Sequence, residues 1–180
     1  DYVVWEGIYS DGRRANNKPY QDCGLCTIRN ADYVIVRDCK FDGESNETWL
    51  GNNYAAIRAE NCTNILIQDN YIKNFGSIQN SVNNQGIGMY DNPNFVIENN
   101  TIIACGHAFH PKAARSEDLY GIVRYNYVEG CNHFMRIGAM RELVPTGKYS
   151  EIHNNVLVNN RYFMECTTSD GVMYHDYYDI

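Results

Sequence analysis

The stretches NILIQDNYIKNF (residues 64–75) and NFVIENNTIIAC (residues 94–105) carry the pattern that decides the fold. In each, an aliphatic residue is followed three positions later by an asparagine. The pairing of an aliphatic residue with a small turn residue occurs six times: Val4/Gly7, Val36/Cys39, Ile67/Asn70, Ile97/Asn100, Val123/Asn126 and Ile152/Asn155. Successive pairs are 26 to 32 residues apart. A period near thirty that drifts by insertions is typical of a solenoid, in which each repeat stacks on the last.

Each repeat also alternates apolar and polar residues and is rich in Val, Ile, Tyr and Phe, which indicates short β-strands. No segment of useful length has the 3.6-residue period of an amphipathic helix. Every repeat holds a second short strand around one apolar residue: Ile28, Ile57, Ile87, Phe109, Met135 and Met164. Two or three strands per repeat predict an all-β fold. We expect a right-handed parallel β-helix of about six coils, formed as one domain over residues 1–180.

Stacked coils place equivalent residues about 4.8 Å apart, so the repeated asparagines should form an internal ladder with a structural role. The expected ladder contains Asn70, Asn100, Asn126 and Asn155. Cys105 and Cys131 each lie five residues after a ladder asparagine and should stack on adjacent coils. Interior cysteine behaves as a small apolar filler, which favours two buried thiols, although the expected spacing would also permit a disulfide.

Composition limits the partners of the chain. A net charge of −7 disfavours nucleic acid and acidic membranes as partners. No apolar run reaches the roughly 20 residues of a membrane span. The sequence does not open with the basic-then-apolar pattern of a signal peptide, although a mature exported protein would have lost one, and we expect a secreted, extracellular or cell-surface protein.

Both ends of the chain are expected to be strands without capping elements. An uncapped solenoid end exposes unpaired backbone, so we expect the chain to be part of a longer β-helix or to stack on other chains. This expectation favours one class of function, a non-catalytic fibre, tailspike or adhesin-like unit that self-assembles or binds glycans.

Loops suggest a cleft over the second strand. Insertions precede this strand at Arg13–Asp22, Glu44–Asn53 and Ser77–Gln85, and follow it at Ala113–Leu119 and Ala139–Lys148. Loops on both sides would leave the outward face of the strand as the floor of a groove. One expected outward column contains Arg29, Arg58, Gly88, His110, Arg136 and Glu165, and the next contains Ala31, Glu60, Tyr90, Lys112, Gly138 and Thr167.

The basic centre of these columns suits an anionic sugar polymer, although a solvated polar face would carry similar residues. Removing a proton alpha to a uronate carboxylate needs a cation, a base and an acid. Arg58 and Arg136 are candidate carboxylate clamps, because guanidinium groups match carboxylates. Lys112 or His110 is the candidate base, because nearby cations disfavour the protonated forms, and Tyr90 or His110 is the candidate acid.

Further residues are assigned to binding. Arg29 extends the basic column, and Glu165 is a salt-bridge partner for Arg136 more readily than a catalytic acid. Trp49 and Tyr54 could stack on sugar rings or form a hydrophobic lid over the coil.

The whole chain resembles the pectate-lyase-like superfamily of right-handed β-helices. Within it, His110-Pro-Lys112 followed by Phe134-Met-Arg136-Ile-Gly138 is similar to the alginate lyase and chondroitinase B family. The resemblance implies that Lys112 is the base, that Arg136 is its partner, and that the substrate is an acidic polysaccharide cleaved by β-elimination. The sequence departs from the family at Ile137, where the family has histidine.

Hydrolase and metal chemistry find less support in the sequence. A glycoside hydrolase needs two carboxylates on the cleft floor, and Glu60 and Glu165 lie more than three coils apart. No cofactor is expected; Glu117-Asp118 is a conceivable calcium ligand pair, although a solvated turn is the preferred interpretation. The histidines His107, His133, His153 and His175 show no metal-ligand spacing.

Overall fold

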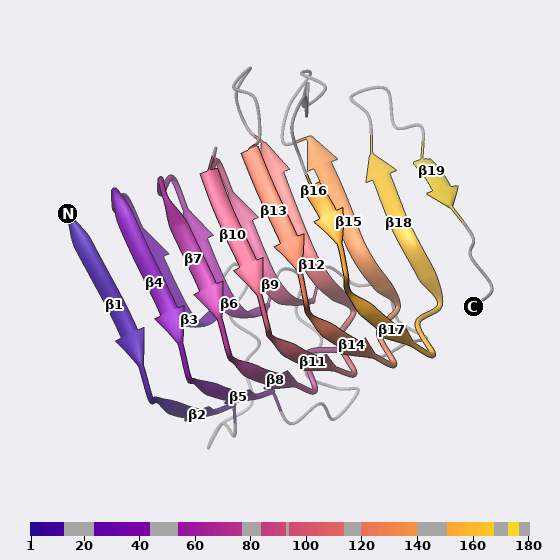
Figure 1. Ribbon diagram of the computed structural model, residues 1–180, viewed down its shortest axis with the longest axis horizontal. Coiled ribbons are helices and arrows are strands. Elements are labelled where there is room, and N and C mark those ends of the chain that lie inside the picture. The colour runs from indigo at the N-terminus through magenta and orange to yellow at the C-terminus, as the bar shows by residue number, and fades with distance from the viewer. Residues whose placement is uncertain are drawn as a thin grey trace.

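The computed structural model describes residues 1–12, 24–43, 54–76, 84–92, 94–113, 120–139, 151–167 and 173–176. Within these ranges every regular element is a β-strand, and the strands form three sheets that run along the whole molecule (Figure 1). Each turn of the chain adds one strand to each sheet. All neighbouring strands are parallel except the last pair.

The bounds of the strands follow from this winding. Sheet A contains β1 (Tyr2–Glu6), β4 (Tyr33–Arg37), β7 (Ile65–Gln68), β10 (Asn94–Glu98), β13 (Tyr120–Arg124) and β16 (Glu151–His153). Sheet B contains β2 (Tyr9–Asp11), β5 (Lys40–Asp42), β8 (Tyr71–Lys73), β11 (Thr101–Ile103), β14 (Tyr127–Glu129) and β17 (Val156–Val158). Sheet C contains β3 (Gly24–Arg29), β6 (Ala55–Glu60), β9 (Gln85–Tyr90), β12 (His107–Ala113), β15 (His133–Ala139), β18 (Tyr162–Thr167) and the antiparallel β19 (Met173–Asp176).

The predicted fold class, an all-β parallel solenoid, is therefore confirmed. The solenoid has about four turns, slightly fewer than the six coils predicted from the sequence repeats. The core is a continuous column of Ile, Val, Phe and Cys side chains between the three sheets. Because each turn contributes only a few apolar residues, the core exists only when turns stack.

The bend between sheets A and B explains the asparagine period. Its corner residues have positive φ angles between 53° and 57°, and they are Asp38, Asp69, Asn99, Tyr125 and Asn154. Asn and Asp adopt this left-handed conformation more readily than other non-glycine residues. The residue after each corner points inward, and in four successive turns it is a ladder asparagine.

The predicted asparagine ladder is confirmed. The side-chain nitrogen Nδ2 of Asn70 donates to Oδ1 of Asn100 at 2.9 Å. In the same way, Nδ2 of Asn100 donates to Oδ1 of Asn126 at 3.0 Å, and Nδ2 of Asn126 donates to Oδ1 of Asn155 at 2.9 Å. Cys39 begins the row, because its backbone N–H donates to Oδ1 of Asn70 at 3.1 Å. The ladder satisfies polar groups that would otherwise be buried without partners at each corner.

Cys105 and Cys131 also lie on adjacent turns, as expected, and both are free and buried thiols. The backbone N–H of Cys105 donates to Sγ of Cys131 at 3.4 Å. Burial raises the pKa of the Cys105 thiol well above its usual range, and the neighbouring Cys131 adds to this effect. Both side chains therefore act as apolar filling in the core.

The register of sheet C confirms the expected alignment of Ile57, Ile87, Phe109, Met135 and Met164. The first turn differs, because Cys26 and not Ile28 lies opposite Ile57. Ile28 is itself buried, opposite Ala59, so β3 has two inward apolar positions. A pattern with a period of two cannot choose between registers that differ by two residues.

This two-residue difference corrects the start of the outward columns. Thr27, not Arg29, lies opposite Arg58. Arg29, not Ala31, lies opposite Glu60, and Ala31 is buried beyond the strand.

Candidate functional site on the outer face of sheet C

The outward residues of sheet C form rows in which side chains from successive turns lie next to one another. The first row predicted from the sequence runs through Arg58, Gly88, His110, Arg136 and Glu165. The second runs through Glu60, Tyr90, Lys112 and Gly138. The register thus places Arg58 and Glu165, which are more than a hundred positions apart in sequence, in the same row of one face.

At the N-terminal end of these rows, two arginines bind one carboxylate. Nε of Arg29 lies 2.5 Å from Oε2 of Glu60, and Arg58 binds Oε1 of the same residue. Burial raises the pKa of Glu60, but the hydrogen bonds from Arg29 and Arg58 outweigh burial and leave the pKa below its ordinary value. Arg58 is buried and also lies over the ring of Tyr90, with Cζ 4.1 Å from the ring centroid. Its guanidinium therefore interacts with both Glu60 and Tyr90 within the protein.

Tyr90 is the central aromatic residue of the site. Nε2 of Gln85 donates to its phenolic oxygen at 3.0 Å, and Nζ of Lys112 lies 5.2 Å from the ring centroid. Gly88 lies between these residues, and a Cβ at this position would be 1.9 Å from Oε1 of Gln85. A glycine is therefore needed for Gln85 to reach across to Tyr90.

Three buried histidines, His107, His110 and His133, lie on the two following turns of the same face. The ring centroid of His107 is 5.1 Å from that of His110 and 4.8 Å from that of His133. Burial lowers the pKa of His110 well below its usual value, and the nearby charge of Lys112 lowers it further. Burial also lowers the pKa of His107, together with His133 and Arg136. Both imidazoles are therefore neutral at neutral pH.

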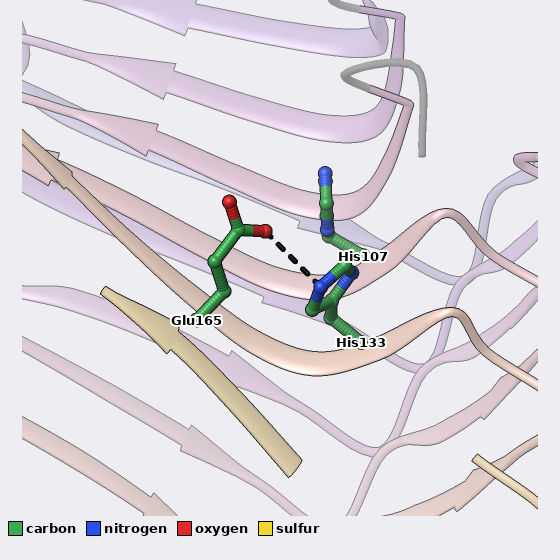
Figure 2. Close-up of side chains that lie close together, drawn as sticks. All are labelled: His107, His133 and Glu165. Atoms are coloured by element: carbon green, nitrogen blue, oxygen red, sulfur yellow. Dashed lines mark ion pairs between the residues drawn. The ribbon is translucent and has the colours of Figure 1, made fainter. Parts of the chain in front are cut away.

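Glu165 closes the row from the next turn. Its side chain is 4% exposed, and its Oε2 lies 3.1 Å from Nε2 of His133 (Figure 2). Its other oxygen, Oε1, lies 3.3 Å from Nε of Arg136, which confirms the expected pairing of Glu165 with Arg136. Nη1 of Arg136 in turn lies 3.4 Å from Nε2 of His107. One carboxylate thus holds an arginine and a histidine in place.

The structure brings most of the predicted site residues onto one face. Tyr90, His110, Lys112, Arg136 and Glu165 lie on four successive turns of sheet C. Arg58 lies on the preceding turn, but Arg29 belongs beside Glu60, as described above.

The predicted walls of the groove are only partly described. Tyr54 stacks on Phe75, with ring centroids 5.6 Å apart, and packs against the core. Trp49, the pair Glu117-Asp118 and nearly all of the proposed loops lie outside the described residues. The depth and lining of the groove stay predictions.

A third outward row was missed by the sequence reasoning. It contains Gln85, His107, His133 and Tyr162, which are in register on four turns. The signal was present, because His107 and His133 each lie seven residues after a ladder asparagine. Two consecutive core residues follow each histidine, so alternation counted back from Phe109 would place His107 in the interior and does not reveal this row.

A separate hollow lies on sheet B, away from these rows. It has a volume of about 280 Å³ and is lined by Tyr9, Lys40, Phe41, Asp42, Tyr71 and Lys73. No residue that the sequence assigned to catalysis or binding lines this hollow.

Among the residues that the structure describes, no helix has the length and apolar character needed to cross a membrane. Comparison of the chain with protein-family models, with curated proteins and with solved structures finds no match. The parallel β-solenoid is therefore the level at which the chain is classified.

Proposed function

We propose that this chain is a carbohydrate-active β-solenoid that cleaves an acidic, uronate-containing polysaccharide by β-elimination. The observation that supports this proposal most is the position of Lys112. It lies beside Tyr90 in register, next to His110 on its own strand, and near Arg136 on the following turn. The groups that a β-elimination needs therefore lie on one face of one sheet.

The chemistry requires a base, an acid and a cation. The base removes the proton from the carbon alpha to the uronate carboxylate, and the electron pair of the broken carbon–hydrogen bond forms a carbon–carbon double bond. The bond to the glycosidic oxygen breaks at the same time, and the acid protonates that oxygen. The cation stabilises the negative charge that develops on the carboxylate in the transition state.

Lys112 is assigned as the base and Arg136 as the carboxylate-binding cation. The side chain of Arg136 is 20% exposed and Lys112 is half-buried, so solvent reaches both of them. A guanidinium group can bind a carboxylate through two parallel hydrogen bonds. Glu165 holds Nε of Arg136 from the next turn, which orients the guanidinium without covering it completely.

Tyr90 is assigned as the acid, with His110 as a second group able to exchange a proton. Nε2 of Gln85 donates to the phenolic oxygen of Tyr90 at 3.0 Å, and the Tyr90 hydroxyl donates to Oε1 of Gln85 at 3.4 Å, so the Gln85 side chain orients the hydroxyl. Among the residues that the structure describes, neither ring nitrogen of His110 has a hydrogen-bond partner. Its imidazole therefore keeps an acceptor nitrogen for a proton beside Lys112.

The similarity of His110-Pro-Lys112 and Arg136-Ile-Gly138 to the alginate lyase and chondroitinase B pattern supports the same assignment. The chain as a whole carries a charge of −7, so attraction of an acidic polymer depends on the local cations Lys112 and Arg136. Arg58 is buried and its charge is compensated by Glu60. Such substrates are extracellular polymers, and the proposal therefore includes export of the protein.

The proposal is tested by incubating the folded protein with alginate, pectate and sulfated and non-sulfated glycosaminoglycans. Each β-elimination leaves an unsaturated uronate, whose ultraviolet absorbance rises with time. We expect a rise with at least one of these polymers and none with neutral glucans or xylans, which lack the carboxylate. Absence of a rise with every acidic polymer would contradict the proposal.

A further inference from the structure

Three buried side chains from successive turns converge on one point of sheet C. His107 lies on β12, His133 on β15 and Glu165 on β18, and each is at most 3% exposed. One potential ligand atom from each residue lies within 4.8 Å of those of the other two. The carboxylate of Glu165 points toward the two imidazoles, which lie side by side (Figure 2).

Hydrogen bonds among the described residues do not account for all the polar atoms of this cluster. Nδ1 of His107 is buried and has no hydrogen-bond partner among the described residues. His110, 1% exposed and next to His107, has no hydrogen-bond partner at either ring nitrogen within the described ranges. Buried polar atoms without partners are rare in folded proteins, and an ion that binds beside them is one explanation.

We propose that His107, His133 and Glu165 bind a divalent transition-metal ion, with Zn²⁺ as the first candidate. Two imidazoles and one carboxylate are a ligand set that Zn²⁺ uses when a fourth position is left for water or another ligand. Nitrogen ligands favour Zn²⁺, Co²⁺, Ni²⁺ or Cu²⁺ over Ca²⁺ and Mg²⁺, which bind mainly oxygen. The site shares Glu165 and Arg136 with the proposed lyase face, but metal binding is measured without polysaccharide and does not depend on lyase activity.

The stacking of successive turns brings these three side chains together. His107 and His133 occupy equivalent positions on adjacent turns, where side chains are about 5 Å apart. Glu165 comes from the third turn, three positions after Tyr162, which is the residue opposite His133. Although Glu165 is in register with Arg136, its Oε2 lies 3.1 Å from Nε2 of His133.

Arg136 is a positioning residue for this cluster and also limits its affinity. It binds Oε1 of Glu165, whereas Oε2 faces His133, so one carboxylate oxygen is available to an ion. Metal-binding carboxylates are commonly held in this way by an outer hydrogen-bond donor. Its positive charge opposes the bound cation, so we expect a weaker site than one without an arginine.

The experiment uses Co²⁺ as a spectroscopic probe and Zn²⁺ in titration calorimetry, with the whole chain and without polysaccharide. We expect one ion per chain, a visible cobalt spectrum of nitrogen and oxygen ligation, and a higher thermal midpoint when Zn²⁺ is added. His107→Ala and Glu165→Gln should each weaken binding by at least the roughly 10–100-fold that loss of an outer partner costs. Glu165→Gln keeps the shape of the side chain, which limits effects on folding.

His153→Ala is the matched control. His153 also lies near a glutamate, with Nε2 3.9 Å from Oε2 of Glu151, but its side chain is 37% exposed on sheet A. Binding should be unchanged in this variant. The proposal is overturned if the wild-type chain binds neither ion at one equivalent, or if His107→Ala and Glu165→Gln bind as tightly as the wild type. A thiolate-to-cobalt charge-transfer band would place the ion at cysteine and would overturn it even if the variants failed to fold.

Discussion

Nε of Arg29 lies 2.5 Å from Oε2 of Glu60 on the next turn of the solenoid. Arg58 binds the second oxygen of the same carboxylate from within strand β6. In the register expected from the sequence, Arg29 would lie opposite Arg58 and the two positive charges would repel each other. In the structure Arg29 lies opposite Glu60 instead. The acid between them compensates both charges, so the N-terminal part of the outward face is an ion-pair network.

This network predicts a loss of stability in acid. The pKa of Glu60 is lowered in the folded protein, because hydrogen bonds from Arg29 and Arg58 outweigh the effect of burial. A lowered pKa gives stability that is present above the pKa of the unfolded chain and is lost as the pH falls through the folded pKa. Glu60→Gln should therefore flatten the acid limb of unfolding free energy against pH, measured with urea between neutral and acidic pH. The same slope in wild type and variant would contradict the assignment, and Glu151→Gln, which removes an exposed carboxylate, is the control.

The asparagine ladder predicts a steep dependence of stability on position. Oδ1 of Asn100 accepts from the backbone and side-chain nitrogens of Asn70 at 3.0 and 2.9 Å. Its Nδ2 donates to the carbonyls of Ile67 and Glu98 and to Oδ1 of Asn126, each at 3.0 Å. Asn100→Ala leaves several of these buried groups without partners, so it should cost at least about 3 kcal/mol.

The control for this prediction is Asn155→Ala, in the last position of the ladder. Asn155 is only partly buried, so water can replace its lost hydrogen bonds and the cost should be roughly 1 kcal/mol. Urea or guanidinium unfolding of the two variants measures the difference. Equal costs would show that the row is not a continuous internal ladder.

Cysteine reactivity tests the packed interior. The sequence has seven cysteines, and five of them (Cys26, Cys39, Cys62, Cys105 and Cys131) are free and buried. Burial raises the pKa of Cys26 to about 12, and it also raises that of Cys105. Because the thiolate is the reactive form, these thiols should resist a chromogenic disulfide reagent at mildly alkaline pH.

We therefore expect at most two thiols per chain to react in the native protein and all seven after denaturation. A readily reacting third thiol under native conditions would contradict the core described above. The number of reactive thiols is measured on the wild-type protein, so a folding defect caused by a substitution cannot affect the result.

The sequence predicted the parts of this fold that repeat with a strong chemical preference. Corner asparagines and inward Ile and Phe residues recur because each turn faces the same steric and hydrogen-bonding demands. From Ile57 onward the register of sheet C follows from these residues. At β3 it did not, because Cys26 and Ile28 both face the core and either could align with Ile57.

The site was harder to predict than the fold for a related reason. Tyr90, Lys112 and Arg136 lie at outward positions that alternate with inward core residues, so the alternation in the sequence predicted them. His107 and His133 are each followed by two successive residues that both enter the core, so strict alternation of inward and outward residues fails there. Burial of the outward face was equally unpredictable, because it depends on what packs over the sheet and not on the repeat.

The central functional claim is that Lys112 takes a proton from a uronate. The most direct test compares the initial rate of unsaturated-product formation by Lys112→Ala, Lys40→Ala and the wild type on the best polymer. Lys40 is an exposed lysine on sheet B and is the matched control. We predict that the rate of Lys112→Ala falls by about 10²–10⁴-fold, as expected for loss of a general base, while Lys40→Ala keeps the wild-type rate. A wild-type rate in folded Lys112→Ala would contradict the account.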